Sequence, residues 1–117
     1  MDTDQACLFC DIVLGKIPSR IVYRDKDVVA FEDINPQAPT HILIIPVRHI
    51  PSVLEIEETD SALLGHIYKV VRQLAHEYRL NERGFRLVIN SGPDSGQAVP
   101  HLHFHLLGGR KLSWPPG

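Results

Sequence analysis

The sequence lacks most of the features that mark specialised classes of protein. It has only two cysteines and no long run of like charge. Its 12 lysines and arginines nearly balance its 14 acidic residues, giving a net charge of -2. No segment approaches the ~20 apolar residues of a membrane span. These absences argue against a membrane protein and against a basic module for duplex nucleic acid. An anionic ligand must therefore be small and held by local groups.

What the sequence does contain is enough apolar material for one core. It is 44% hydrophobic and 22% charged, as in soluble globular proteins. No internal repeat or linker divides residues 1–117, so we expect a single domain. The opening residues 1–5 carry no signal-peptide pattern, and we expect a cytoplasmic protein in which Cys7 and Cys10 form no disulfide.

Hydrophobic periodicity predicts an α+β fold with a largely antiparallel five-stranded sheet, one short helix and one long helix. Helical spacing marks residues 7–14 and 63–78, and Thr59 or Asp60 is the expected cap of the long helix. Apolar runs rich in β-branched residues mark strands at 21–23, 28–31, 42–45, 85–90 and 101–107. The continuous run 42–45, ended by Pro46, is the expected central strand.

Three of the seven histidines alternate in the segment His101-Leu102-His103-Phe104-His105. Because side chains on a strand alternate between faces, the three imidazoles share one face and the apolar residues point to the core. We expect the histidine face to be open. One tetrahedral metal ion cannot bind all three, because the outer two lie roughly 13 Å apart along a strand. The pattern therefore favours a nucleophilic or acid–base imidazole, anchored through its second nitrogen by a carbonyl.

Two further patterns have both a functional and a plain structural interpretation. The glycine-rich loop 92–97 can turn backbone N–H groups toward an anion, although such loops more often simply connect strands. Next to the histidines it favours a phosphate cradle. Cys7 and Cys10 have the spacing of half a zinc site or, equally, of two buried thiols on one helix face. In the long helix, solvated or core-edge positions are the ordinary interpretation of His66 and His76.

The segment 101–107 resembles the His-φ-His-φ-His-φ-φ motif of the histidine triad (HIT) superfamily. Residues 30–41, 108–110 and 114–117 resemble its Hint branch. The whole resemblance extends from about Cys7 to the last residue without a long gap. It implies a purine nucleoside phosphoramidase that hydrolyses the P–N bond of adenosine or guanosine 5′-monophosphoramidates. It also implies a homodimer with a sheet that continues across the subunits and with Trp114 reaching toward the partner's site.

The resemblance also implies a role for individual residues. His103 is the expected nucleophile, oriented by the carbonyl of His101, while His105 donates to phosphate oxygens and His41 supports the site. The expected substrate contacts are Asp33 at the ribose hydroxyls, Leu8, Phe9, Ile17 and Ile34 around the base, and Asn90, Gly96, Gln97, Ala98 and Val99 around the phosphate. At position 98 the chain departs from relatives that carry serine, whose hydroxyl can assist the departing amine.

Relatives that keep the two cysteines complete a structural zinc site with two histidines. Those histidines match His49 and His101, which predicts zinc bound by Cys7, Cys10, His49 and His101. The resemblance implies no catalytic cofactor.

Two other functions are compatible with these motifs. Dinucleoside polyphosphate hydrolysis or nucleotidyl transfer would use the same histidine, and the Hint-like terminus argues against both. A non-catalytic nucleotide-binding interaction module would not need the middle imidazole of the triad, so the intact triad argues against it.

Overall fold

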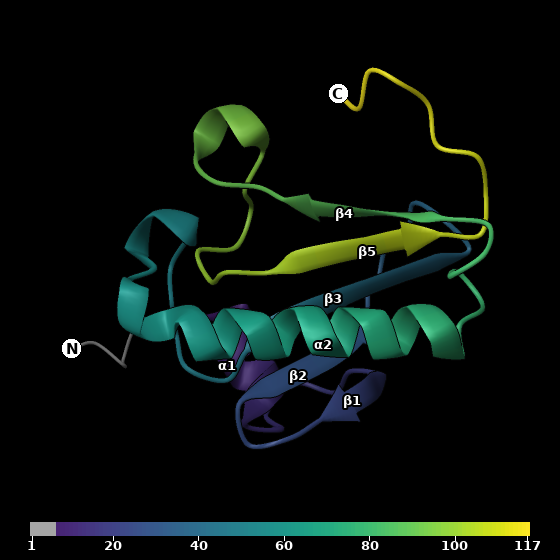
Figure 1. Ribbon diagram of the computed structural model, residues 1–117. Coiled ribbons are helices and arrows are strands. Elements are labelled where there is room, and N and C mark those ends of the chain that lie inside the picture. The colour runs from purple at the N-terminus through teal and green to yellow at the C-terminus, as the bar shows by residue number, and fades with distance from the viewer. Residues whose placement is uncertain (1–6) are drawn as a thin grey trace.

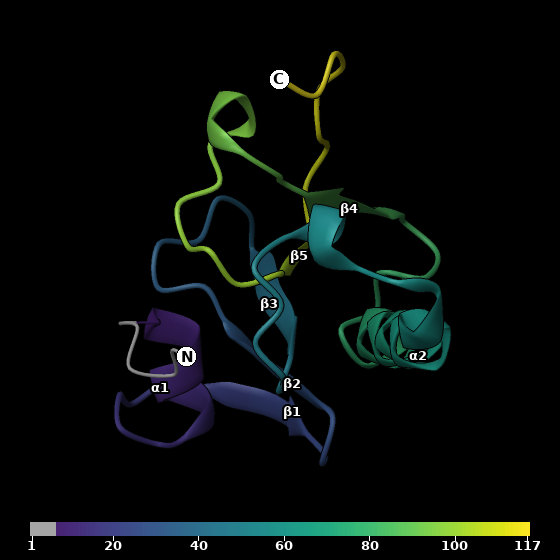
Figure 2. The same cartoon turned by 90° about the vertical axis from the view of Figure 1, so that its left-hand side faces the viewer.

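The computed structural model describes residues 7–117. Five antiparallel strands form one sheet in the order β1-β2-β3-β5-β4. The strands are β1 Ile21–Arg24, β2 Val28–Glu32, β3 Thr40–Pro46, β4 Phe85–Ile89 and β5 Phe104–Gly108. Helix α1 (Leu8–Val13) covers one face of the sheet and helix α2 (Ser61–Glu77) the other (Figure 1, Figure 2). The predicted α+β fold, with one short and one long helix, is confirmed.

Each face of the sheet has its own hydrophobic core, because β2 and β3 are buried on both sides. On the α2 side, Ile67 and Leu74 pack with Phe104 of β5. On the α1 side, Phe9 and Ile12 pack against β2 and β3. The continuous apolar run that predicted a central strand is the doubly buried strand β3.

Helix α2 follows the predicted periodicity but begins differently from the expected cap. Asp60 stands at the N-cap position, yet its side chain makes no capping bond to α2. Instead it accepts a hydrogen bond from the backbone N–H of Glu57 (2.9 Å) and pairs with Arg48. It thereby closes the short 3₁₀ turn Glu58–Asp60 that leads into the helix. No helix within residues 7–117 combines the length and the apolar content needed to cross a bilayer.

Strand β5 begins at Phe104, three residues later than the sequence predicts. The N–H of Leu102 donates to the carbonyl of Ile50 (2.6 Å), and the N–H of His101 donates to the carbonyl of Val99 (2.8 Å). These bonds take residues 101–103 out of the ladder with β3. The prediction of one strand over 101–107 is therefore wrong at its start, although Leu102 still reaches the α2-side core.

Candidate functional site

The three alternating histidines lie on the α1 side of the sheet, and two of them are buried. His101 is 0% exposed and His103 is 6% exposed. The ring of Phe9, from α1, lies 6.0 Å from the ring of His101 and 5.0 Å from that of His103, centroid to centroid. The prediction of an open histidine face is wrong at these two positions because α1 covers them. His105 is partly exposed.

His103 is oriented by the backbone of His101. Its Nδ1 donates to the carbonyl oxygen of His101 over 2.6 Å. Because a carbonyl oxygen only accepts hydrogen bonds, the proton of neutral His103 lies on Nδ1. Its Nε2 then carries the lone pair, which is the state that a nucleophilic imidazole requires.

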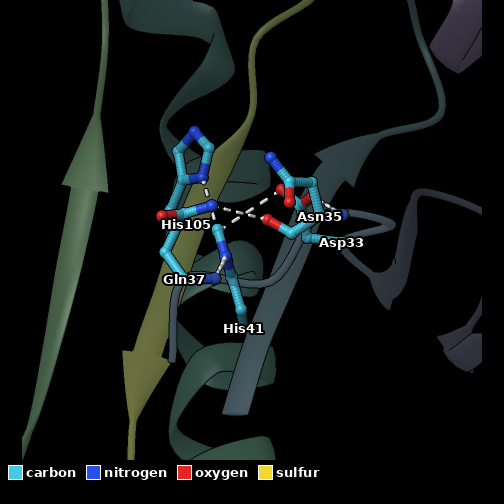
Figure 3. A network of polar contacts seen from close by, with 5 residues as sticks. All are labelled: Asp33, Asn35, Gln37, His41 and His105. Carbon is cyan, nitrogen blue, oxygen red and sulfur yellow. Dashed lines mark hydrogen bonds and ion pairs between the residues drawn. The ribbon is translucent and has the colours of Figure 1, made fainter. Parts of the chain in front are cut away.

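His105 belongs to a second cluster of polar side chains, drawn from three parts of the chain (Figure 3). Its Nδ1 lies 3.0 Å from Nε2 of His41 on β3, and that nitrogen lies 3.4 Å from Oδ2 of Asp33. Nδ1 of His41 accepts a hydrogen bond from the backbone N–H of Gln37 over 3.0 Å. Nε2 of His105 is buried and has no hydrogen-bond partner within residues 7–117.

Burial keeps the imidazoles of His41 and His105 uncharged. Burial, and then the neighbouring His103 and His41, lower the pKa of His105 to about 4 against the opposing effect of Asp33. Burial also lowers the pKa of His41, again opposed by Asp33. Both rings are therefore neutral near pH 7, so each has one N–H donor and one acceptor nitrogen.

The four residues predicted to bind zinc converge on one point beside α1. Their ligand atoms all lie within 4.8 Å of one another. Nδ1 of His101 lies 3.4 Å from Sγ of Cys7 and 3.2 Å from Nδ1 of His49, which in turn lies 3.2 Å from Sγ of Cys10. Tetrahedral zinc, with its usual bond lengths, separates sulfur from nitrogen by roughly 3.5 Å and nitrogen from nitrogen by roughly 3.3 Å. The donor set and its spacing fit zinc.

The surroundings of the cluster also suit a metal ion. Nε2 of His101 donates to the carbonyl of Pro46 over 2.8 Å, so its Nδ1 turns a lone pair toward the cysteines. Burial lowers the pKa of His101 to about 4. Burial, and then the hydrogen bond and charge of Cys7, raise the pKa of Cys10 to about 12. A thiolate at Cys10 therefore needs a cation to stabilise it at neutral pH.

The glycine-rich loop forms a tight turn before the histidines. Gly92 and Gly96 both have a φ of 84°, a conformation that favours glycine, and they enclose the 3₁₀ turn Pro93–Ser95. The side chain of Gln97 braces the turn: its Oε1 accepts from the N–H of Gly92 (2.9 Å), and its Nε2 donates to the carbonyls of Pro51 and Val99. The amide of Gln97 thus has internal partners.

The remaining predicted substrate residues differ in exposure. Ile34 is 100% exposed and Leu8 is 47% exposed, whereas Phe9 is buried against the histidines. Ile17, Asn90 and Val99 are half-buried, and Gly96 and Ala98 are exposed. Asp33 and His41 line a hollow of about 100 Å³. A cavity of about 430 Å³ lies between the β1–β2 turn and α2, but no histidine of residues 101–105 lines it.

Sequence reasoning missed several partners of the histidines. The N–H of Gln37 and the carbonyl of Pro46 are main-chain groups, which leave no mark in a sequence. It also missed that His66, considered only as a solvated or core-edge residue, pairs with Asp25 across 2.5 Å. A charged residue in a hairpin turn opposite a helical histidine gives no local pattern that would reveal this pair.

Comparison with known proteins gives a consistent result. The HIT domain family matches residues 15–112. The chain is 48% identical to a 14 kDa zinc-binding protein of Zea mays, over 97% of this chain and 90% of that protein. It superposes on a HIT family hydrolase from Legionella pneumophila with a TM-score of 0.94 and 50% identity, covering 96% of this chain and 100% of the other. It superposes on a histidine triad nucleotide-binding protein from Candida albicans with a TM-score of 0.81 and 33% identity, covering 94% and 83%.

Proposed function

This chain belongs to the HIT family, and we propose that it is a hydrolase of the Hint type, acting on the P–N bond of purine nucleoside 5′-monophosphoramidates. The observation that carries the proposal is the bond from Nδ1 of His103 to the carbonyl of His101, since it leaves Nε2 of His103 as a fixed nucleophile. Hydrolase and nucleotide-binding relatives with the same fold support the class of reaction and of ligand.

In the first step, Nε2 of His103 forms a bond to phosphorus, and the bond from phosphorus to the amine nitrogen breaks. The amine leaves with a proton taken from solvent, because Ala98 offers no hydroxyl at this position. In the second step, the oxygen of a water molecule forms a bond to phosphorus and a proton of that water returns to solvent. The bond from phosphorus to Nε2 breaks, which releases the nucleoside monophosphate and restores His103. Two easier displacements thus replace one difficult displacement.

The other residues of the site hold the substrate. Nε2 of His105 is buried and has no hydrogen-bond partner among residues 7–117. As an N–H donor it would stabilise charge on the phosphoryl oxygens. We place Asp33 at the ribose hydroxyls and Ile34 and Leu8 against the base. The backbone N–H groups of Ala98 and Val99 donate no hydrogen bond within residues 7–117, which suits a phosphate cradle. We propose Asn90 as a further donor of that cradle. Gly96 and Gln97 would shape it rather than donate, because their N–H groups bond to the carbonyls of Pro93 and Gly92 within the turn.

We also propose that Cys7, Cys10, His49 and His101 bind a structural zinc ion, for which the spacing and the donor types are suitable. With four protein ligands, such an ion supplies rigidity and has no open position for substrate. A zinc-binding protein among the relatives supports this site.

A homodimer is the arrangement we propose for the assembled protein. Strand β4 lies at one edge of the sheet, where Phe85 and Ile89 are partly exposed. Trp114 is 80% exposed in the C-terminal tail, 6.0 Å from the guanidinium of Arg86. An exposed edge and an exposed indole both favour cover by a second copy. A monomeric mass by light scattering at micromolar concentration would rule this out.

Release of AMP from adenosine 5′-phosphoramidate tests the function directly. We expect release by the wild type and none above background by His103→Ala. If both release AMP, His103 is not the nucleophile. If neither does, simple phosphoramidates are not substrates, and dinucleoside polyphosphates become the next substrates to test.

A further inference from the structure

We propose that Arg110 is a positioning residue that, through Gln37 and His41, fixes His105 in the tautomer with its proton on Nε2. Its catalytic consequence rests on the function proposed above. The tautomer itself is a property of the protein without substrate, and it follows from three contacts.

The first contact fixes His41. The backbone N–H of Gln37 points at Nδ1 of His41 over 3.0 Å (Figure 3). A backbone N–H can only donate, so Nδ1 of His41 carries no proton. Because burial lowers the pKa of His41, the ring is neutral, and its single proton lies on Nε2.

The second contact passes this constraint to His105. Nε2–H of His41 faces two atoms, Nδ1 of His105 at 3.0 Å and Oδ2 of Asp33 at 3.4 Å. If His105 carried its proton on Nδ1, two N–H groups would face each other across 3.0 Å. His105 therefore accepts at Nδ1 and carries its proton on Nε2. A protonated Nε2 on His41 also makes Asp33, His41 and His105 a poor metal site, although their ligand atoms lie within 4.8 Å.

The resulting N–H donor of His105 lies beside the proposed nucleophile and is unmatched among the described residues. Nε2 of His105 is buried without a hydrogen-bond partner in residues 7–117. The ring of His105 lies 5.0 Å from the ring of His103, centroid to centroid. A buried N–H next to the nucleophile is matched by an acceptor that arrives with the substrate, and a phosphoryl oxygen has that chemistry.

The third contact holds the loop that carries Gln37. Nε and Nη2 of Arg110, just after β5, donate to the carbonyl of Gln37 over 3.1 and 2.9 Å. The side chain of Gln37 donates to the carbonyl of Asn35 (3.0 Å), whose own N–H donates to Oδ1 of Asp33 (2.8 Å). Arg110 thus fixes the residue whose N–H sets the tautomer of His41. The hydrogen bonds of the Arg110 side chain go to the carbonyls of Gln37 and Lys111 and not to His41 or His105, so its effect must pass through the loop.

Histidine tautomers can be measured directly by long-range ¹H–¹⁵N correlation spectra of ¹⁵N-histidine-labelled protein. We expect wild-type His41 and His105 to carry their protons on Nε2. Arg110→Gln removes the guanidinium and should give both rings a measurable fraction of the Nδ1–H tautomer. Arg110→Gln should also lower kcat for AMP release about fivefold, the factor for losing one hydrogen bond, here the bond from His105 to a phosphoryl oxygen. KM should change little. Lys111→Gln, one residue along and equally exposed, should change neither spectrum nor rate.

A proton on Nδ1 of His105 in the wild type would overturn the proposal. So would Arg110→Gln with wild-type tautomers and wild-type kcat. If Arg110→Gln fails to fold, Arg110→Lys provides the same test, because it keeps the charge but loses the two parallel donors. Failure of the proposed function looks different: the wild type would release no AMP while His105 still carried its proton on Nε2.

Discussion

The carbonyl oxygen of His101 accepts a 2.6 Å hydrogen bond from Nδ1 of His103, while the imidazole of the same His101 lies among Cys7, Cys10 and His49. Every other polar atom of His101 is also engaged. Its N–H donates to the carbonyl of Val99, and its Nε2 donates to the carbonyl of Pro46. One fully buried residue thus joins the proposed zinc centre to the proposed nucleophile, so a change at the zinc centre should reach His103.

Loss of zinc should therefore reduce both stability and rate. We expect about one zinc per chain in protein prepared without chelator, and much less in Cys10→Ala. That variant should unfold at a temperature lower by ~10 °C or more, because a structural metal contributes several kcal/mol. Its kcat should fall roughly tenfold as His101 loosens its hold on His103. The exposed His76→Ala provides a control that leaves metal content unchanged. Metal-free protein with wild-type melting temperature and rate would contradict the zinc centre.

The Asp25 carboxylate should contribute stability that depends on pH. Burial raises its pKa, but hydrogen bonds from Tyr23, His66 and two backbone N–H groups outweigh this and lower it below its usual value. A carboxylate with a lowered folded-state pKa stabilises the fold above its unfolded pKa near 4, and this stability is lost as pH falls through the folded value. Asp25→Asn should reduce the free energy of unfolding by about 1–3 kcal/mol at pH 7.

Urea unfolding at pH 7 and near pH 2.5 checks this expectation. The difference between wild type and Asp25→Asn should shrink at the lower pH. Asp27→Asn, in the same turn and exposed, should stay within ~0.5 kcal/mol of wild type at both values. A difference that is equal at the two pH values would show that the charge of Asp25 contributes no stability.

Local patterns in the sequence predicted the elements well, and tertiary contacts account for the differences. Helix α2 and strand β3 were predicted because periodicity and a doubly buried apolar run are local signals. The start of β5 was wrong because it depends on the bond from Leu102 to Ile50, which lies 52 positions away in the chain. Spacing identified only Cys7 and Cys10 as possible ligands, and the family resemblance was needed to add His49 and His101. The cover that α1 places over His103 has no local signature.

His105 should make the fold less stable in mild acid. Burial lowers its pKa to about 4 in the folded protein, whereas an unfolded histidine titrates near 6.5. The unfolded chain therefore binds more protons in this range, and stability should fall as pH decreases from about 6.5 to 4. His105→Asn should remove about 1–3 kcal/mol of this decrease. Chemical unfolding between pH 4 and 7 measures how the free energy of unfolding depends on pH, and the exposed His76→Asn is the control. If this dependence were the same for wild type and His105→Asn, His105 would have no such effect.

Two glycines should respond in opposite ways to the same added methyl group. Gly109 has a φ of 92°, and a Cβ there would lie 2.9 Å from Cβ of Pro39, so Gly109→Ala introduces both strain and a clash. We expect a loss of about 1–3 kcal/mol in the free energy of unfolding. Gly65 lies in α2, where a Cβ would meet nothing within 4 Å, so Gly65→Ala should add about 0.5–1 kcal/mol through helix propensity alone. Urea unfolding of the two variants tests both signs. Gly109 also lies between β5 and Arg110, so Gly109→Ala should lower kcat for AMP release, whereas Gly65→Ala should leave kcat unchanged. If Gly109→Ala stabilised the protein instead, the turn would be able to relax without its left-handed glycine.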